Sequence, residues 1–210
     1  MAPSRYFRRE VETAKYTLNT PLSEEDVRKL RVGDLVYLNG TIYTARDMAH
    51  KRLLRLAETG KRPPISLDGA VIYHAGPIVR RKGKGWEVVS AGPTTSLRMA
   101  KAALSLLNHY AVRMIIGKGG LGENVEETLS WRGAVYCHYP GGAAVLAAEG
   151  IKQVVGVRWL SLGMPEALWM LRVEGFGPLL VAIDTHGGNL YREVESRVKE
   201  NLKRLTAELA

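Results

Sequence analysis

The chain has 210 residues, of which 46% are apolar and 24% are charged, which is enough for one domain with a substantial core. This balance excludes a disordered or fibrous chain. No apolar run approaches the roughly 20 residues that a membrane-spanning helix needs. The basic N-terminal segment has no apolar stretch behind it, so no secretory signal is expected. We therefore expect a globular protein of the cytoplasm.

The charge balance is strongly basic, with 30 lysines and arginines against 21 acidic residues and a formal net charge of +9. Such a balance suits nucleic acid, an acidic partner or an anionic small substrate. The basic residues are spread over most of the chain and mixed with acidic ones. Nucleic-acid binders more often concentrate them in a stripe with interleaved aromatics. A nucleic-acid partner is therefore not expected.

Metal chemistry within this chain is not expected either. Its one cysteine, Cys137, excludes an internal disulfide framework, a four-cysteine zinc site and a self-contained iron–sulfur cluster. Cys137 lies in an apolar run, where a buried inert thiol is the default. The five histidines show neither a His-x3-His nor a His-Glu-x-x-His spacing, so no mononuclear metal site is predicted.

Two helices are predicted in the first third of the chain. Ser23 and Asp26 form a capping-box pattern at the start of a short helix. A second helix is predicted over 46–58, with Gly60 as its stop.

Between these helices the sequence predicts a β-hairpin. Asn39-Gly40 separates two apolar runs, 35–38 and 41–44. A type I′ turn needs positive φ at both central residues, and Asn-Gly is the pair that best supplies it.

The remaining pattern predicts one mixed α/β domain with a central sheet and flanking helices. The C-terminal spacing of Val194, Val198, Leu202 and Leu205 predicts an amphipathic docking helix. The other predicted elements are strands at 70–74 and 86–90, a basic turn at 80–85, a helix from the 92–96 turn to 108, strand 112–116, a helix from 123, strand 134–138, a short helix to 149, and strands at 153–160, 167–173 and 179–183.

Several strand-to-helix junctions carry polar or glycine-rich turns. In open α/β sheets such turns gather at the carboxyl ends of the strands, where ligands bind. Helix N-termini there also offer free N–H groups to an anion.

One of these turns, Gly117–Gly122, matches G-x-G-x-x-G between a predicted strand and a predicted helix. A lysine fills its second position, and no acidic residue about 20 positions further on is placed to take the ribose hydroxyls. Both points count against dinucleotide binding. The other interpretations are a tight turn, or an anion cradle into which Lys118 is aimed.

The turn at 92–99 is a second candidate. Thr94 or Thr95 is placed to cap the helix, and Arg98 lies about one turn further on. A hydroxyl, free N–H groups and a guanidinium would then converge. From spacing alone, a well-capped helix with a surface arginine explains the pattern equally well.

Arg46 marks the third candidate turn. A cation at a helix start opposes the helix dipole, which favours an anionic ligand or Asp47 as the group that holds it there. His50, one turn further on, is interpreted as a packing histidine. Arg46, Arg98 and Lys118 together predict a pocket for a small substrate with two carboxylates, since arginine forks bind carboxylates at two points.

These turns also carry a family resemblance. In this order they resemble the motifs of class I fumarate hydratases, and more narrowly of their β subunit or equivalent C-terminal domain, a family shared with the β subunit of L-tartrate dehydratase. The likeness runs from about Tyr16 to Asn189 and makes the dinucleotide fingerprint a false positive. The motifs are Thr44-Ala45-Arg46-Asp47-x-Ala49-His50-Lys51-Arg52, Gly92-Pro93-Thr94-Thr95-x-x-Arg98-Met99, Ile116-Gly117-Lys118-Gly119-Gly120 and Tyr139-Pro140-Gly141-Gly142-Ala143-Ala144.

The resemblance implies a swivelling β/β/α-type single domain over residues 16–190. Residues 1–15 would form an arm, and residues 191–210 a helix that packs on the domain or on a partner. It implies reversible hydration of fumarate to L-malate, a reaction of the tricarboxylic acid cycle, by a heteromeric enzyme. The [4Fe–4S] cluster of such an enzyme is held by three cysteines of an α subunit, so this chain would be inactive without that partner.

The resemblance further implies that Arg46, Arg98 and Lys118 bind the substrate carboxylates and that Thr94 is the base that moves the C3 proton. Two alternatives stay open. One is dehydration of L-tartrate or another hydroxy-diacid by the same family. The other is a basic, non-catalytic binding protein that keeps the fold.

Overall fold

The structure is a computed structural model that describes residues 13–208. The arm predicted over residues 1–15 therefore lies almost wholly outside the described residues. The strands are β1 (Lys15–Asn19), β2 (Leu35–Thr44), β3 (Val71–Tyr73), β4 (Ile78–Lys82), β5 (Gly85–Ser90), β6 (Met114–Gly117), β7 (Val135–His138), β8 (Ile151–Arg158) and β9 (Leu168–Ile183). The helices are α1 (Glu24–Arg28), α2 (Asp47–Glu58), α3 (Ala100–His109), α4 (Val125–Arg132), α5 (Ala144–Glu149) and α6 (Leu190–Glu208), with 3-10 helices at Ser96–Met99 and Leu160–Leu162.

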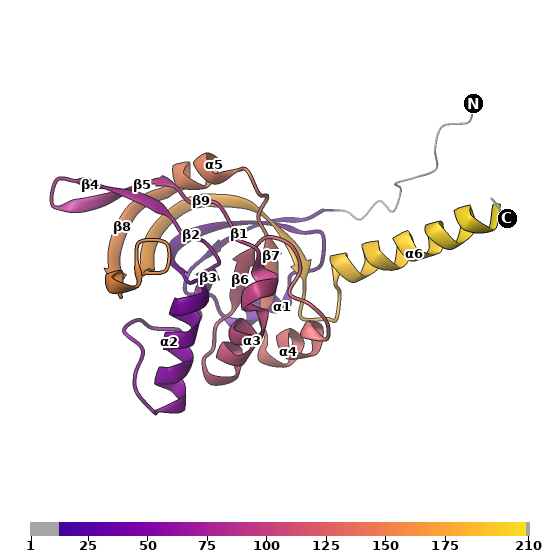
Figure 1. The fold of residues 1–210 in the computed structure, drawn as a ribbon, viewed down its shortest axis with the longest axis horizontal. Helices are drawn as coiled ribbons and strands as arrows, with labels where there is room; N and C mark the ends of the chain where they lie inside the picture. The colour runs from indigo at the N-terminus through magenta and orange to yellow at the C-terminus, as the bar shows by residue number, and fades with distance from the viewer. Residues whose placement is uncertain (1–12, 209–210) are drawn as a thin grey trace.

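Five strands close into a barrel-like sheet at the centre of the molecule (Figure 1). Strands β2, β3, β6 and β7 run parallel to one another in that order. The long strand β9 is antiparallel to both β7 and β2, and it thereby joins the two ends of the parallel set. Strand β1 extends the sheet beside β2, and β8 lies along the first part of β9. The expected mixed α/β fold with flanking helices is confirmed.

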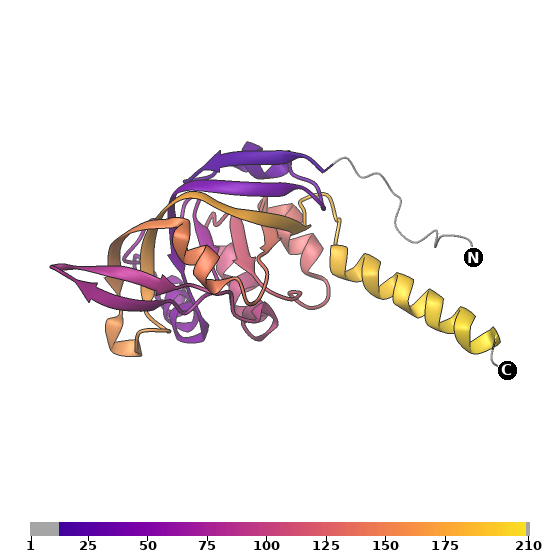
Figure 2. The ribbon, with the colours of Figure 1, turned by 90° about the horizontal axis from the view of Figure 1, so that it is seen from above.

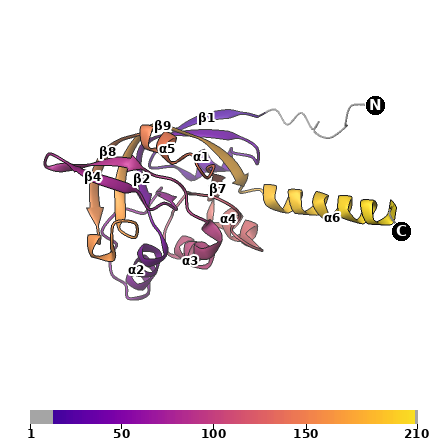
Figure 3. The ribbon, with the colours of Figure 1, turned by 45° about the horizontal axis from the view of Figure 1, so that its top comes forward.

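Alternate residues of the parallel strands serve two separate cores. Val71 and Tyr73 of β3 point into the barrel with Cys137 and Trp169, whereas Ile72 points outward. The outward side chains pack against α2, α3 and α4, which lie together along one side of the barrel (Figure 3). Because both faces are covered, these short strands are apolar throughout, as parallel strands usually are.

The short helix α1 begins as predicted. The Ser23 hydroxyl accepts from the backbone N–H of Asp26, and the Asp26 carboxylate accepts from the backbone N–H of Ser23 at 3.0 Å. This capping box satisfies two N–H groups that a helix start otherwise leaves without partners.

The hairpin predicted at Asn39-Gly40 is wrong. Residues 35–44 form one continuous strand, β2, which pairs with β9 along most of its length. Gly40 has a φ of +107° and sits where the register against β9 shifts. A Cβ at Gly40 would lie 2.4 Å from the hydroxyl oxygen of Thr20. The glycine therefore permits a bend and a close backbone approach inside a strand instead of a turn.

Two further predictions need correction. The strands predicted at 167–173 and 179–183 are parts of the single strand β9. The helix predicted after the 92–96 turn begins as a 3-10 helix, with Thr95 at its N-cap position but without a side-chain capping bond. The remaining predicted strands and helices are present with shifts of a few residues at their ends.

Two elements project from opposite ends of the body (Figure 2). One is the β4–β5 hairpin, which carries most of the basic run 80–85 in its first strand. The other is α6, whose Val194, Val198, Leu202 and Leu205 are all exposed. What α6 packs on stays a prediction. Within residues 13–208 no helix is both long and apolar enough to cross a bilayer.

Candidate active site

The parallel strands bring four turns to one rim of the barrel. Because β2, β3, β6 and β7 share a direction, their carboxyl ends meet at the same edge. The residues that follow these strands include Arg46, His74, Lys118 and Pro140. The 92–98 segment joins them, since Ala75 bridges Pro93 and Thr95 bridges Lys118. The four turns that sequence analysis singled out are thus neighbours in space.

Arg46 occupies the N-cap position of α2 without a capping side-chain bond. Its Nε lies 3.2 Å from Oε1 of Glu166, close enough for an ion pair but out of line for a hydrogen bond. The other carboxylate oxygen of Glu166 accepts from the backbone N–H of Met48 at 2.9 Å. Glu166, from the turn before β9, therefore adds a second negative charge beside Asp47 at the start of α2, supplies the capping acceptor that Arg46 does not, and orients Arg46 at the same time.

Arg98 reaches the same helix start from the 3-10 helix. Its Nη2 donates to Oδ2 of Asp47 at 2.8 Å. Asp47 follows Arg46 directly in the sequence, so this bond brings Arg98 to the helix start at which Arg46 lies. This arrangement places Arg46 and Arg98 in one region of the surface.

Thr94 is half-buried beside the end of β3. Its backbone N–H donates to the carbonyl of His74 at 2.7 Å. Lys118 is held from two directions: its carbonyl accepts from the backbone N–H of Ser96 at 3.0 Å, and its side chain passes Gly141. A Cβ on Gly141 would lie 3.6 Å from the Lys118 amine. The flat glycine backbone lets this amine lie across the turn after β7.

The rim carries apolar side chains as well as cations. Large hydrophobic residues are exposed on elements that adjoin the turns of the rim, which is unusual because apolar area is normally buried or scattered singly. They are Met48, Ile78, Leu97, Val145 and Leu146. The rim therefore has the composition of a contact surface.

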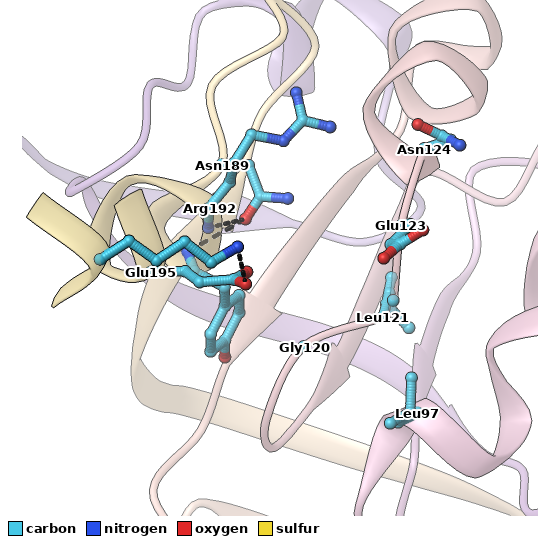
Figure 4. Close-up of a pocket in the computed structure, with 11 residues that line it drawn as sticks. Leu97, Gly120, Leu121, Glu123, Asn124, Asn189, Arg192 and Glu195 are labelled. Atoms are coloured by element: carbon cyan, nitrogen blue, oxygen red, sulfur yellow. Dashed lines mark hydrogen bonds and ion pairs between the residues drawn. The ribbon is translucent and has the colours of Figure 1, made fainter. Parts of the chain in front are cut away.

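A cavity of about 470 Å³ lies next to the rim, between the glycine loop and the base of α6. Figure 4 shows Leu97 and Leu121 on one wall and Asn189, Arg192 and Glu195 of the α6 region on the other. Arg192 pairs with the buried Glu126 at 2.9 Å, and Lys199 pairs with Glu195 at 2.7 Å. Its charges are thus largely neutralised within the chain, and none of the predicted site residues lines it.

Two buried histidines lie beneath the rim. His50 donates from Nδ1 to the carbonyl of Arg46 at 3.0 Å, and its ring meets that of His74 edge to face at 5.0 Å. Burial lowers the pKa of His50, and burial together with His50 lowers the pKa of His74 well below its usual range. The interpretation of His50 as a packing histidine is confirmed.

Sequence reasoning missed the supporting residues His74, Ser96, Tyr136 and Glu166. None of them has a motif spacing of its own, and two, His74 and Tyr136, lie in apolar runs that pattern alone assigns to buried strands. The sequence signal that was available was a histidine in the apolar run 70–74, which needs a hydrogen-bond partner if it is buried.

The described residues do not fit a metal centre or an iron–sulfur cluster. Among residues 13–208 no group of three or more His, Cys, Asp or Glu side chains could hold a metal ion. Cys137 lies inside the barrel, where burial raises the pKa of its thiol far above the usual range. A thiol of this kind is a structural residue and not a ligand.

The fold and the rim define a mixed α/β barrel with three cations, Arg46, Arg98 and Lys118, on turns at one edge. Comparison with known families is specific: the chain belongs to the family described as Fumarase C-terminus, whose model matches residues 2–194. Most of α6 lies beyond that match.

Similar proteins carry two kinds of name. The chain is 48% identical over 180 residues to the L(+)-tartrate dehydratase subunit beta of Escherichia coli K12, which covers 85% of this chain and 88% of that protein. It is 45% identical over 192 residues to a putative L(+)-tartrate dehydratase subunit beta of Methanocaldococcus jannaschii, covering 91% and 98%. It is also 41% identical over 187 residues to a putative fumarate hydratase class I of Geobacillus stearothermophilus, of which the match covers only 35%.

Proposed function

We propose that this chain is the β subunit of a hydro-lyase that adds water to, or removes it from, a small dicarboxylate. The single observation that carries the proposal is the meeting of Arg46, Arg98 and Lys118 on one rim. Three cations within one region exceed what one carboxylate needs and suit a diacid. The two arginines offer planar forks for carboxylates, and Lys118 adds a mobile point charge.

In this proposal the cations bind and orient the substrate, and Thr94 handles a proton. In the dehydration direction the Thr94 alkoxide takes the C3 proton while the C2–O bond breaks and hydroxide leaves C2. In hydration the Thr94 hydroxyl returns its proton to C3 while the hydroxide of water adds to C2. A threonine hydroxyl is a weak base at neutral pH, so its alkoxide needs stabilisation from nearby positive groups. The cations that hold the carboxylates are the groups available to supply it.

The [4Fe–4S] cluster that the family resemblance implies would then belong to a different polypeptide. The buried Cys137 and the lack of a ligand group among the described residues support this assignment. The partner, an α subunit, would cover the rim. The exposed apolar side chains of the rim support that placement, since apolar area of this kind becomes buried when a partner docks.

Two substrates are in contention. Fumarate hydration to L-malate is favoured by the motif resemblance and by the similarity to a putative class I fumarate hydratase. Dehydration of L-tartrate to oxaloacetate is favoured by the two tartrate dehydratase β subunits, which match this chain over nearly their full length. The rim cations grip a carboxylate pair and do not distinguish a second hydroxyl.

The test is to assemble the chain with its α partner under anaerobic conditions and supply each substrate separately. Loss of fumarate absorbance, or formation of oxaloacetate from L-tartrate, is the expected result and names the substrate. The same mixture without this chain is the control. An assembled complex that acts on neither diacid would overturn the proposal. Salt-sensitive binding of the chain to polyanions, without any need for the α partner, would instead favour the non-catalytic binding protein.

A further inference from the structure

A buried network of hydrogen bonds lies beneath the cationic rim, and the proposed function assigns it no role. Nδ1 of His74 lies 2.9 Å from the Ser96 hydroxyl oxygen. That oxygen lies 3.0 Å from the phenolic oxygen of Tyr136, which in turn lies 2.7 Å from the carbonyl of Gly119. His74, Ser96 and Tyr136 are all fully buried. This hydrogen-bond network connects the end of β3 to the glycine loop after β6.

The direction of these hydrogen bonds follows from the last acceptor in the series, the Gly119 carbonyl. A carbonyl oxygen only accepts, so the single phenolic proton of Tyr136 goes to Gly119. Ser96 must then donate its proton to Tyr136, because two oxygens at 3.0 Å without a proton between them repel. The remaining bond is a donation from Nδ1–H of His74 to Ser96. His74 is therefore the tautomer protonated on Nδ1.

This assignment leaves Nε2 of His74 as a bare lone pair. Nε2 is buried, and no donor of the described residues reaches it. The titratable group that faces His74 is His50, whose own proton is used on the Arg46 carbonyl. A buried polar atom without a partner is rare and calls for an explanation other than stability.

The same residues fix the rim through the backbone. The His74 carbonyl accepts from Thr94, and Ser96 donates its backbone N–H to Lys118. Gly117 completes the arrangement, because a Cβ there would lie only 1.8 Å from the Ser96 hydroxyl oxygen. Any other residue at Gly117 would expel that hydroxyl and open the chain of bonds.

We infer that His74 is a positioning residue, which uses the hydroxyls of Ser96 and Tyr136 to lock the segment bearing Thr94 onto the loop bearing Lys118. This inference rests on the proposed function for its kinetic consequence. The lock fixes where the proton-handling hydroxyl stands relative to a carboxylate-binding amine. A fully satisfied hydrogen-bond network restricts the relative position of the two segments more than apolar packing alone does.

The first test uses the chain alone and does not depend on activity. Long-range ¹H–¹⁵N correlation of the imidazole nitrogens of His74 is expected to give the neutral Nδ1–H pattern between about pH 6 and pH 8. Tyr136→Phe is expected to mix the tautomers and to shift the amide signals of Thr94 and Lys118. An Nε2–H pattern in the unchanged chain, or unmoved amide signals in the variant, would overturn the inference.

The second test uses the enzyme assembled with its α partner. Tyr136→Phe is expected to lower kcat about tenfold with little change in KM, because misplacement of a reacting group costs turnover first. Tyr110→Phe is the matched control, since it also removes a buried tyrosine hydroxyl but at the end of α3. Equal kcat values for the two variants would contradict the lock.

A double-mutant cycle separates the lock from general loosening of the core. Ser96→Ala and Tyr136→Phe break the same chain of bonds, so the double variant is expected to lose no more kcat than the worse single one. Losses that multiply would count against the inference. If the unchanged complex acts on neither diacid, the proposed function fails, and the tautomer and amide signals still decide the lock.

Discussion

Nη2 of Arg98 donates to Oδ2 of Asp47 at 2.8 Å and so joins the 3-10 helix to the start of α2. The Arg98 side chain is 53% exposed and that of Asp47 34%, so water screens the pair and its contribution to stability is small. The bond uses one of the five N–H groups of the guanidinium. The pair therefore aims Arg98 and still leaves donors for a ligand.

Arg98→Lys is expected to lower kcat/KM of the assembled enzyme about 10- to 100-fold, the range set by losing a charged hydrogen bond of ~1.5–3 kcal/mol. A lysine amine cannot both hold Asp47 and grip a carboxylate at two points. Steady-state kinetics on the favoured diacid measures the loss. Arg55→Lys, on the exposed surface of α2, is the control. Unaltered KM and kcat for Arg98→Lys would contradict the carboxylate-binding role.

Thr94→Val removes the hydroxyl and keeps the shape of the side chain. We expect kcat to fall at least about 100-fold with KM largely retained, because proton transfer is lost while the cations still bind the diacid. The neighbouring Thr95 is exposed and caps no N–H, so Thr95→Val should keep normal turnover. Near-normal kcat for Thr94→Val would remove Thr94 as the base.

Glu166→Ala tests the group that orients Arg46. The variant is expected to raise KM more than it lowers kcat, since Arg46 loses the carboxylate beside its Nε. It should also lower the free energy of unfolding by ~1 kcal/mol, because the backbone N–H of Met48 loses its acceptor. Glu174→Ala, an exposed carboxylate of β9, is the control. If KM for Glu166→Ala is no higher than KM for Glu174→Ala, Arg46 does not need the Glu166 carboxylate for substrate binding.

Assembly can distinguish the two candidate docking surfaces. Leu146→Glu places a charge among the exposed apolar residues of the rim. Leu202→Glu places one in the exposed apolar stripe of α6. If the α partner covers the rim, Leu146→Glu should abolish co-elution with it on size exclusion, and Leu202→Glu should not. The opposite pattern would move the interface to α6 and leave the rim open.

The buried histidines give stability a defined pH dependence. Burial depresses the pKa of His50 and His74 in the folded state below the ordinary histidine value of about 6.5. Below that value the unfolded chain binds more protons than the folded one, so stability is lost as the pH falls from about 7 towards 5, at up to about 1.4 kcal/mol per pH unit for each histidine. Acidic residues with lowered pKa, such as Asp26, act at lower pH.

Melting temperatures at several pH values between neutral and mildly acidic check this expectation. His50→Gln should flatten the acid side of the curve, and the exposed His109→Gln should not. A His50→Gln curve parallel to that of the unchanged chain would assign the acid sensitivity to other groups.

Patterns among residues close in sequence predicted many of the helices and strands. The conformation of the other segments depends on contacts with residues far away in the sequence. The capping box at Ser23 and the helix after Arg46 depend on neighbours within a few positions, so they could be found from sequence. Asn39-Gly40 failed because its conformation is set by Thr20 and by β9, which are far away in the chain. The Gly117–Gly122 loop was similarly ambiguous until its neighbours in space were known.

The candidate site divides in the same way. Arg46, Arg98 and Lys118 could be singled out because a cation at a strand–helix turn is conspicuous by itself. Glu166, which orients Arg46, lies 120 positions further along the chain and has no local mark. His74 and Tyr136 were hidden because they are polar residues in apolar runs, and Ser96 because it is one of several hydroxyl residues in a polar turn. Only the geometry shows that the three satisfy one another.

The closure of the sheet by β9 has a consequence for how such a protein can change. A slip of β9 by one residue would break its pairing with β2, β7 and β8 at once, so the framework resists sliding. The exposed side chains of the turns above it, such as Arg98, take no part in that pairing. Selection for a different dicarboxylate substrate can therefore act on those side chains one at a time, while the strands of the barrel stay in place.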